Sequence, residues 1–68
     1  MSDAVKLIVD GFVNLKDRVA LEEMHQHRQR LRGELQQRAG VLDVVGYSLK
    51  IIDADLEAIE DGFAKLQA

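Results

Sequence analysis

The sequence predicts an all-α protein: an antiparallel helical hairpin that pairs with a second copy to form a homodimeric four-helix bundle. Two observations predict helices. The chain contains no proline, and apolar residues keep an alternating spacing of three and four through its last third. A third observation predicts association, since a chain of 68 residues with no cysteine has a marginal core and no disulfide to support it. The spaced residues are Leu42, Val45, Leu49, Ile52, Leu56, Ile59, Phe63 and Leu66.

The first helix is expected over residues 3–38. Ser2 is a suitable N-cap, and Asp3 suits the positive end of the helix. The convincing stop signal is Ala39-Gly40, because glycine tolerates the left-handed conformation that ends many helices. The sequence therefore predicts a turn at 39–40 and a second helix over 41–66, all within a single domain spanning residues 1–68.

The two expected helices differ in length. A partner for the second helix would begin near Phe12, so that residues 2–11 overhang the hairpin. Gly11 lies at that point and favours a hinge with a short N-terminal helix before it, because glycine weakens a helix by about 1 kcal/mol relative to alanine. The alternative is a tolerated glycine within one long helix.

Both helices carry more apolar surface than a two-helix hairpin can bury. The first has the stripe Val5, Ile8, Phe12, Leu15 and Val19, and the second has Val44, Tyr47, Ile51, Ala54 and Ala58. Burying a Val or Ile side chain stabilises by about 1.5–3 kcal/mol, which favours a homodimer; the alternative is completion by a different protein. The expected dimer or partner interface consists of Val5, Ile8, Phe12, Leu15, Val44, Tyr47 and Ile51.

One short pattern occurs twice. Residues 8–15 and 59–66 both read Ile-x-Asp-Gly-Phe-x-x-Leu, and the hairpin would place both segments toward the same end of the rod. The pattern is compatible with two equivalent elements at that end. The favoured interpretation is coincidence in two amphipathic helices, because eight residues are too few to define a repeat.

Basic residues are concentrated at Arg28, Arg30 and Arg32. Such a face suits a nucleic-acid backbone or an acidic protein partner. The favoured interpretation is charge pairing with the acidic second helix, since a turn at Gly40 would bring Arg28 near Asp53. The same register would bring His25 near Asp55 or Glu57. A net charge of -3 gives no general electrostatic attraction to nucleic acid.

A metal site is the third possibility. Glu22 and His25 have the Glu-x-x-His spacing that contributes to di-iron sites in four-helix bundles, and a dimer would supply a second copy. The motif is short and common in Glu-rich helices, so the sequence assigns no metal, cofactor or catalytic residue.

The sequence therefore predicts a non-enzymatic protein–protein interaction module of the adaptor, inhibitor or co-chaperone type. It contains no nucleophile–base arrangement and no glycine-rich phosphate loop. Nucleic-acid binding through the arginine face is the alternative, and metal binding through Glu22 and His25 follows it. No segment has the length of a transmembrane helix and no signal peptide is evident, so we expect no membrane partner and a cytoplasmic location.

Overall fold

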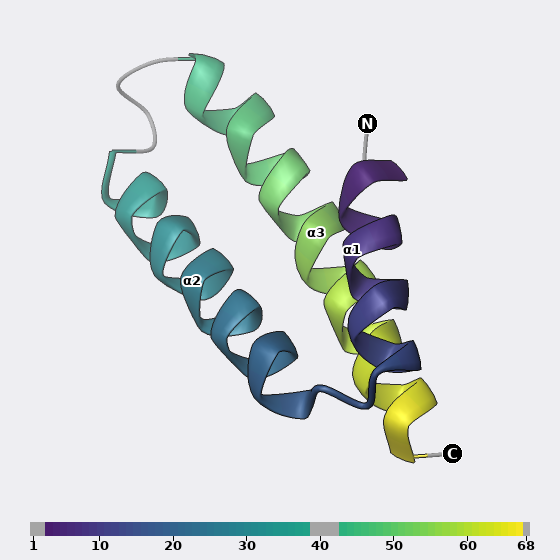
Figure 1. Cartoon of the computed structure of the whole chain (residues 1–68). Coiled ribbons are helices and arrows are strands. Elements are labelled where there is room, and N and C mark those ends of the chain that lie inside the picture. The colour runs from purple at the N-terminus through teal and green to yellow at the C-terminus, as the bar shows by residue number, and fades with distance from the viewer. Residues whose placement is uncertain (1–2, 39–42, 68) are drawn as a thin grey trace.

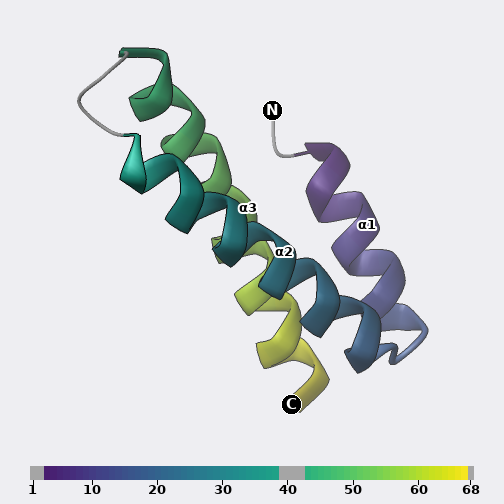
Figure 2. The same ribbon diagram turned by 90° about the vertical axis from the view of Figure 1, so that its left-hand side faces the viewer.

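The computed structural model describes the backbone of residues 3–38 and 43–67. Within these ranges the chain is all-helical, with three helices and no strand: α1 (Asp3–Asn14), α2 (Arg18–Gln37) and α3 (Asp43–Gln67). Helix α2 runs antiparallel to α3, and α1 runs beside α3 in the same direction (Figures 1 and 2). The all-α prediction is confirmed, but the long first helix is divided into two. The predicted turn at 39–40 and the helix start at 41 lie outside the described residues.

The break in the long helix lies at residues 15–17, and Gly11, the predicted hinge, lies inside α1. Two hydrogen bonds close the end of α1: the Lys16 amide donates to the Val13 carbonyl, and the Asp17 amide donates to the Phe12 carbonyl. These bonds form a Schellman motif, with Lys16 in the left-handed conformation at a φ of 56°. The Asp17 carboxylate then accepts a hydrogen bond from the Ala20 amide at 3.1 Å and caps α2.

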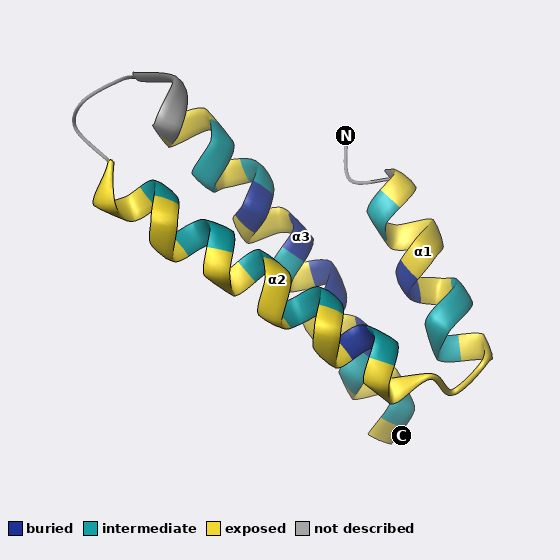
Figure 3. Cartoon of the chain, turned by 60° about the vertical axis from the view of Figure 1, so that its left-hand side comes forward, coloured by how far each residue is buried: buried dark blue, intermediate teal, exposed yellow. Residues whose placement is uncertain are grey.

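Each helix contributes one residue to the centre of the core. Val9 of α1, Leu21 of α2 and Ile59 of α3 are fully or almost fully buried and pack together (Figure 3). Around them lie the partly buried residues Val5, Phe12, Val13, Met24, Phe63 and Leu66. The predicted seam of α3 therefore faces the core at Ile59, Phe63 and Leu66, as expected from its spacing. The side chains of Leu42 and Val45 lie outside the described residues.

Gly62 allows α1 to lie close to α3. A Cβ atom at this position would come within 2.6 Å of the Val9 Cγ1 atom and 3.4 Å of the Val13 Cγ2 atom. The two Ile-x-Asp-Gly-Phe-x-x-Leu segments, residues 8–15 and 59–66, lie side by side in the same direction (Figure 1). They are not equivalent, because a Cβ atom at Gly11 would meet nothing within 4 Å.

Three interhelical pairs fix how α2 lies against α3. The Arg32 Nε and Asp53 Oδ1 atoms are 2.6 Å apart, and the Arg28 Nε and Asp55 Oδ2 atoms are 3.4 Å apart. The His25 Nε2 and Glu60 Oε2 atoms are 3.3 Å apart. Arg28 thus faces Asp55 rather than Asp53, and His25 faces Glu60 rather than Asp55 or Glu57. The expected pairing of the two faces is present, but the observed partners lie two to five residues further along α3 than the predicted register placed them.

Candidate functional site

Helix α1 is much shorter than α3 and covers one part of it. The α1 residue Lys6 lies beside Ala54 and Glu57, and the Asp10 Oδ1 atom is 3.6 Å from the Lys65 Nζ atom. Beyond Ala54, toward the end of the bundle where α2 ends and α3 begins, α2 and α3 continue without a third described helix beside them (Figure 3). We call this the open end. The opposite end, where the 15–17 turn and the C-terminus of α3 lie, is the lower end.

A groove between α2 and α3 occupies the open end. We call it the open-end groove, and its lining residues are Leu31, Glu34, Leu35, Arg38, Ser48, Ile51 and Ile52. Ile52 is buried, whereas Leu31, Leu35 and Ile51 are only half-buried. The exposed Glu34 and Arg38 form a charged rim on the α2 side. The groove therefore has an apolar floor and a polar edge, as protein-binding sites commonly do.

One residue of the second apolar stripe of α3, Ile51, lines the open-end groove. Ala58, at the lower part of this stripe, is 8% exposed, close to Lys6 and Val9 of α1. Ile51 and Tyr47 continue the same stripe past the end of α1, and Tyr47 is 58% exposed. One face of α3 is thus covered by α1 at one end and uncovered at the other. Val44, also predicted in the interface, has no described side chain.

The predicted interface residues of the first helix are divided between the core and the surface. Val5 and Phe12 are half-buried and pack against the core, so the described part of the predicted 2–11 overhang, residues 3–11, is not free. Ile8 and Leu15 remain exposed, at 49% and 76%, and Val19 is 64% exposed. We call these three residues the turn surface, because they flank the 15–17 break.

The structure also identifies groove residues that the sequence did not assign to an interface. Leu31 and Leu35 lie on α2 and face the same groove as Ile51. The spacing of four residues between Leu31 and Leu35 indicates that they share one face of α2. That spacing alone does not show where α1 ends along this face. Leu7 of α1 is a further exposed apolar residue, at 73%.

The arginine face points mainly toward α3. Arg28 and Arg32 contact Asp55 and Asp53, and the Arg28 side chain is only 23% exposed. Arg30 is exposed on α2. Two of the three predicted phosphate-binding residues are therefore engaged with carboxylates, which favours the interpretation that these residues hold α2 and α3 in register.

The Glu22/His25 pair is not assembled into a metal site. The His25 ring makes an edge contact with Phe63 at a centroid distance of 5.8 Å and also contacts Glu60. Glu22 is exposed. Across residues 3–38 and 43–67, no three His, Asp or Glu side chains are gathered in a way that could hold a metal ion.

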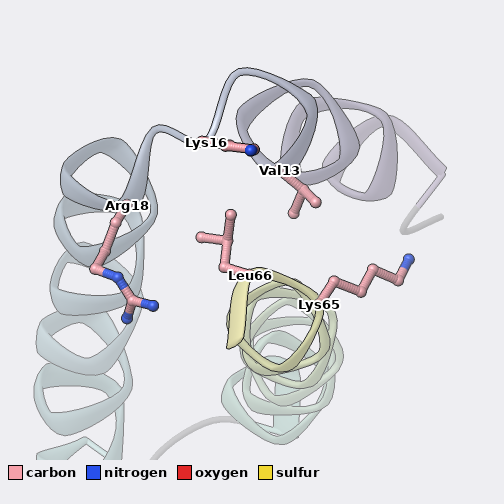
Figure 4. A pocket seen from close by; sticks show the side chains of 5 residues that line it. All are labelled: Val13, Lys16, Arg18, Lys65 and Leu66. Carbon is pink, nitrogen blue, oxygen red and sulfur yellow. The ribbon is translucent and has the colours of Figure 1, made fainter. Parts of the chain in front are cut away.

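A second hollow lies at the lower end, and three cations surround it (Figure 4). Its lining residues are Val13, Lys16, Arg18, Lys65 and Leu66. The Arg18 guanidinium lies 6.0 Å from the centroid of the Phe63 ring, and Lys65 pairs with Asp10. These cations also lie near the C-terminal, negative end of α3, where positive charge is stabilising. Helix stability accounts for Lys65, which lies in the last turn of α3, but not for Arg18, which lies at the positive, N-terminal end of α2.

Comparison with known proteins adds no functional information. No protein-family model, curated protein or solved structure matches this chain. Among the helices of residues 3–38 and 43–67, none combines the length and apolar character needed to cross a bilayer. The open-end groove and the turn surface are therefore the features of the chain that bear on its function.

Proposed function

We propose that this protein is a non-enzymatic protein–protein interaction module, which binds the apolar face of a partner helix in the open-end groove. The proposal depends on one observation. The N-terminal end of α1 lies near Ala54, and this leaves Leu31, Leu35 and Ile51 half-buried along a groove. Helix-in-groove recognition requires such a row of apolar contacts with polar residues at its edge.

Self-association is the second part of the proposal. Among the described residues, apolar side chains are accessible at the open-end groove and at the turn surface, and a homodimer can bury at least one of these surfaces. The sequence predicts a four-helix bundle of two hairpins, and the corresponding arrangement of the three-helix chain would join two α2–α3 pairs along the groove. Adaptor, inhibitor and co-chaperone roles are all consistent with such a module, and the cytoplasmic location remains a prediction.

The experiment compares three versions of the immobilised protein in native extract: the unmodified chain, Ile51→Asp and Lys50→Asp. Ile51 lines the groove, whereas its neighbour Lys50 is exposed and does not. We expect a partner that is retained by the unmodified chain and by Lys50→Asp but lost with Ile51→Asp. With the purified partner, the Ile51→Asp dissociation constant should rise at least about tenfold, since a buried aspartate costs more than 1.4 kcal/mol.

Circular dichroism of each variant provides the control for folding. If all three versions retain the same proteins while remaining equally helical, the groove is not the binding site. Loss of helicity in Ile51→Asp would move the test to Leu35→Asp, which changes the opposite wall of the groove.

A further inference from the structure

We infer that α1 can leave its own α3, join α2 as one continuous helix over residues 3–37, and pack against α3 of a second copy. In this exchanged dimer, each chain replaces the α1 of the other, so the α1–α3 interface of the single chain is formed between chains. The inference rests on the self-association in the proposed function and specifies how the two copies are held together.

An apolar stripe continues across the break at residues 15–17. Val5, Ile8, Phe12, Leu15 and Val19 keep a spacing of three, four, three and four, which is a heptad pattern across the 15–17 turn. In the folded single chain the residues of this pattern beyond Phe12 are not buried, because Leu15 and Val19 are 76% and 64% exposed. In a continuous helix these two residues return to the same face as Ile8 and Phe12.

The backbone at the 15–17 turn has an unfavourable conformation. Lys16 occupies the position where a Schellman motif normally has glycine, and its φ of 56° is unfavourable for a residue with a side chain. A continuous helix relieves this conformation and adds intrahelical hydrogen bonds across residues 15–17. The continuous helix loses the Asp17 cap that the single chain has. The two forms therefore differ by a few local interactions of opposite sign. Short, strained connections of this kind favour exchange.

The relative directions of the three helices also permit the exchange. Helix α1 runs parallel to α3 and antiparallel to α2 (Figures 1 and 2). When α1 extends α2 past the lower end, a two-fold axis at that end places it beside the second copy's α3, again in parallel. Val9 can then meet Gly62, and Asp10 can meet Lys65, across the chain boundary with unchanged geometry.

The two-fold axis also gives the turn surface a partner. In the single chain, Phe12 of α1 and Leu21 of α2 belong to the same core, so antiparallel continuous helices would cross near residue 16 or 17. Leu15 and Val19 lie on either side of that point. Leu15 of each chain therefore faces Val19 of the other, and the side chains most exposed at the turn become buried.

Two substitutions at the turn test the balance between the forms. Lys16→Gly stabilises the turn and should weaken dimerisation about tenfold or more, because each dimer contains two such positions. Asp17→Ala removes the cap and should strengthen dimerisation by about the same factor. Sedimentation equilibrium measures both dissociation constants. Lys6→Ala changes an exposed position within α1 and is the matched control. Its dimer dissociation constant should equal that of the unmodified chain.

A covalent trap then distinguishes exchange from other dimers. The chain has no cysteine, and the Cβ position at residue 62 is 2.6 Å from the Val9 Cγ1 atom, so Val9→Cys with Gly62→Cys brings two sulfur atoms within bonding reach. The dimer fraction is isolated, oxidised and run on a non-reducing denaturing gel. Should this variant fail to fold, Asp10→Cys with Lys65→Cys, joined by a short bifunctional thiol reagent, probes the same interface at its exposed edge.

A covalent dimer from the dimer fraction supports the exchange. A covalent monomer from that fraction overturns it, while leaving self-association through another arrangement, such as the four-helix bundle, in place. If the unmodified chain and Asp17→Ala both remain monomeric at millimolar concentration, the exchange and the self-association fail together, whereas partner binding in the groove is still decided by Ile51→Asp. Ile51→Asp should not dissociate the exchanged dimer, because the groove lies at the opposite end.

Discussion

Gly11 and Gly62 hold the same place in two copies of one short sequence pattern, but their surroundings differ. At Gly62 an added methyl group would meet Val9 at 2.6 Å, and Val9 is buried and has a stiff, β-branched side chain. At Gly11 the added group would meet nothing within 4 Å. The close approach of α1 to α3 therefore depends on one of the two glycines.

The same substitution should consequently have opposite effects at the two positions. We expect Gly62→Ala to lower the free energy of unfolding by ~1–2 kcal/mol, since overpacking outweighs the gain in helix propensity. Gly11→Ala should raise it by about 0.5–1 kcal/mol, because alanine favours the helix without new contacts. Urea unfolding at one fixed protein concentration measures both. Equal stabilisation by the two substitutions would contradict the tight α1–α3 packing.

At the scale of helices, burial rather than distance decides which charge pair matters. The Arg32–Asp53 pair is the shorter, at 2.6 Å, but both side chains are substantially exposed. The Arg28–Asp55 pair is longer, at 3.4 Å, with side chains only 23% and 11% exposed. Removing one member of a partly buried pair leaves the other without its counter-charge, whereas water solvates the remaining member of an exposed pair.

Arg28→Ala should therefore destabilise the α2–α3 pair by about 2 kcal/mol. Arg32→Ala should cost less than about 1 kcal/mol, despite removing the shorter contact. Thermal or urea unfolding of the two variants, side by side, gives the comparison. The double variant Arg28→Leu/Asp55→Leu should recover much of the loss, and its failure to do so would mean that the pair contributes specific attraction beyond neutralising a buried carboxylate.

The sequence predicted an all-helical chain and the core face of α3, because both follow from local spacing. It missed the break at 15–17, since the usual signal, a glycine at the end of α1, is replaced by Lys16, and the apolar stripe continues through Leu15 and Val19. It also missed the length of the uncovered part of α3. That length depends on where α1 turns back, which is a tertiary result of burying Val9 against Ile59 and Gly62.

For the molecule as a whole, the charge pairing between α2 and α3 predicts weak binding to nucleic acid. Arg28 and Arg32 are engaged by Asp55 and Asp53, and the net charge is -3. We expect no retention on immobilised RNA or DNA at physiological salt, and no change with Arg30→Ala. Retention that decreases steeply with salt and is lost in Arg28→Ala/Arg32→Ala would instead support a phosphate-binding role for this face.

The overall dimensions of the dimer give the last prediction. The single chain measures 40 × 20 × 15 Å, with a radius of gyration of 13.0 Å. In the exchanged dimer a continuous helix over residues 3–37 is about 52 Å long, and the two α2–α3 pairs point away from a shared lower end. The longest dimension should then approach twice that of the single chain, with one open-end groove at each extremity.

Small-angle X-ray scattering across a concentration series measures this dimension directly. We expect the maximum distance to rise from near 40 Å toward about 80 Å as the dimer forms, and to shorten again with Lys16→Gly at the same concentration. A dimer whose longest dimension stays near that of one chain would be a side-by-side bundle with the grooves covered. An elongated dimer leaves both grooves accessible, so that two partner helices bound at opposite ends would gain in avidity from a linked, bivalent protein.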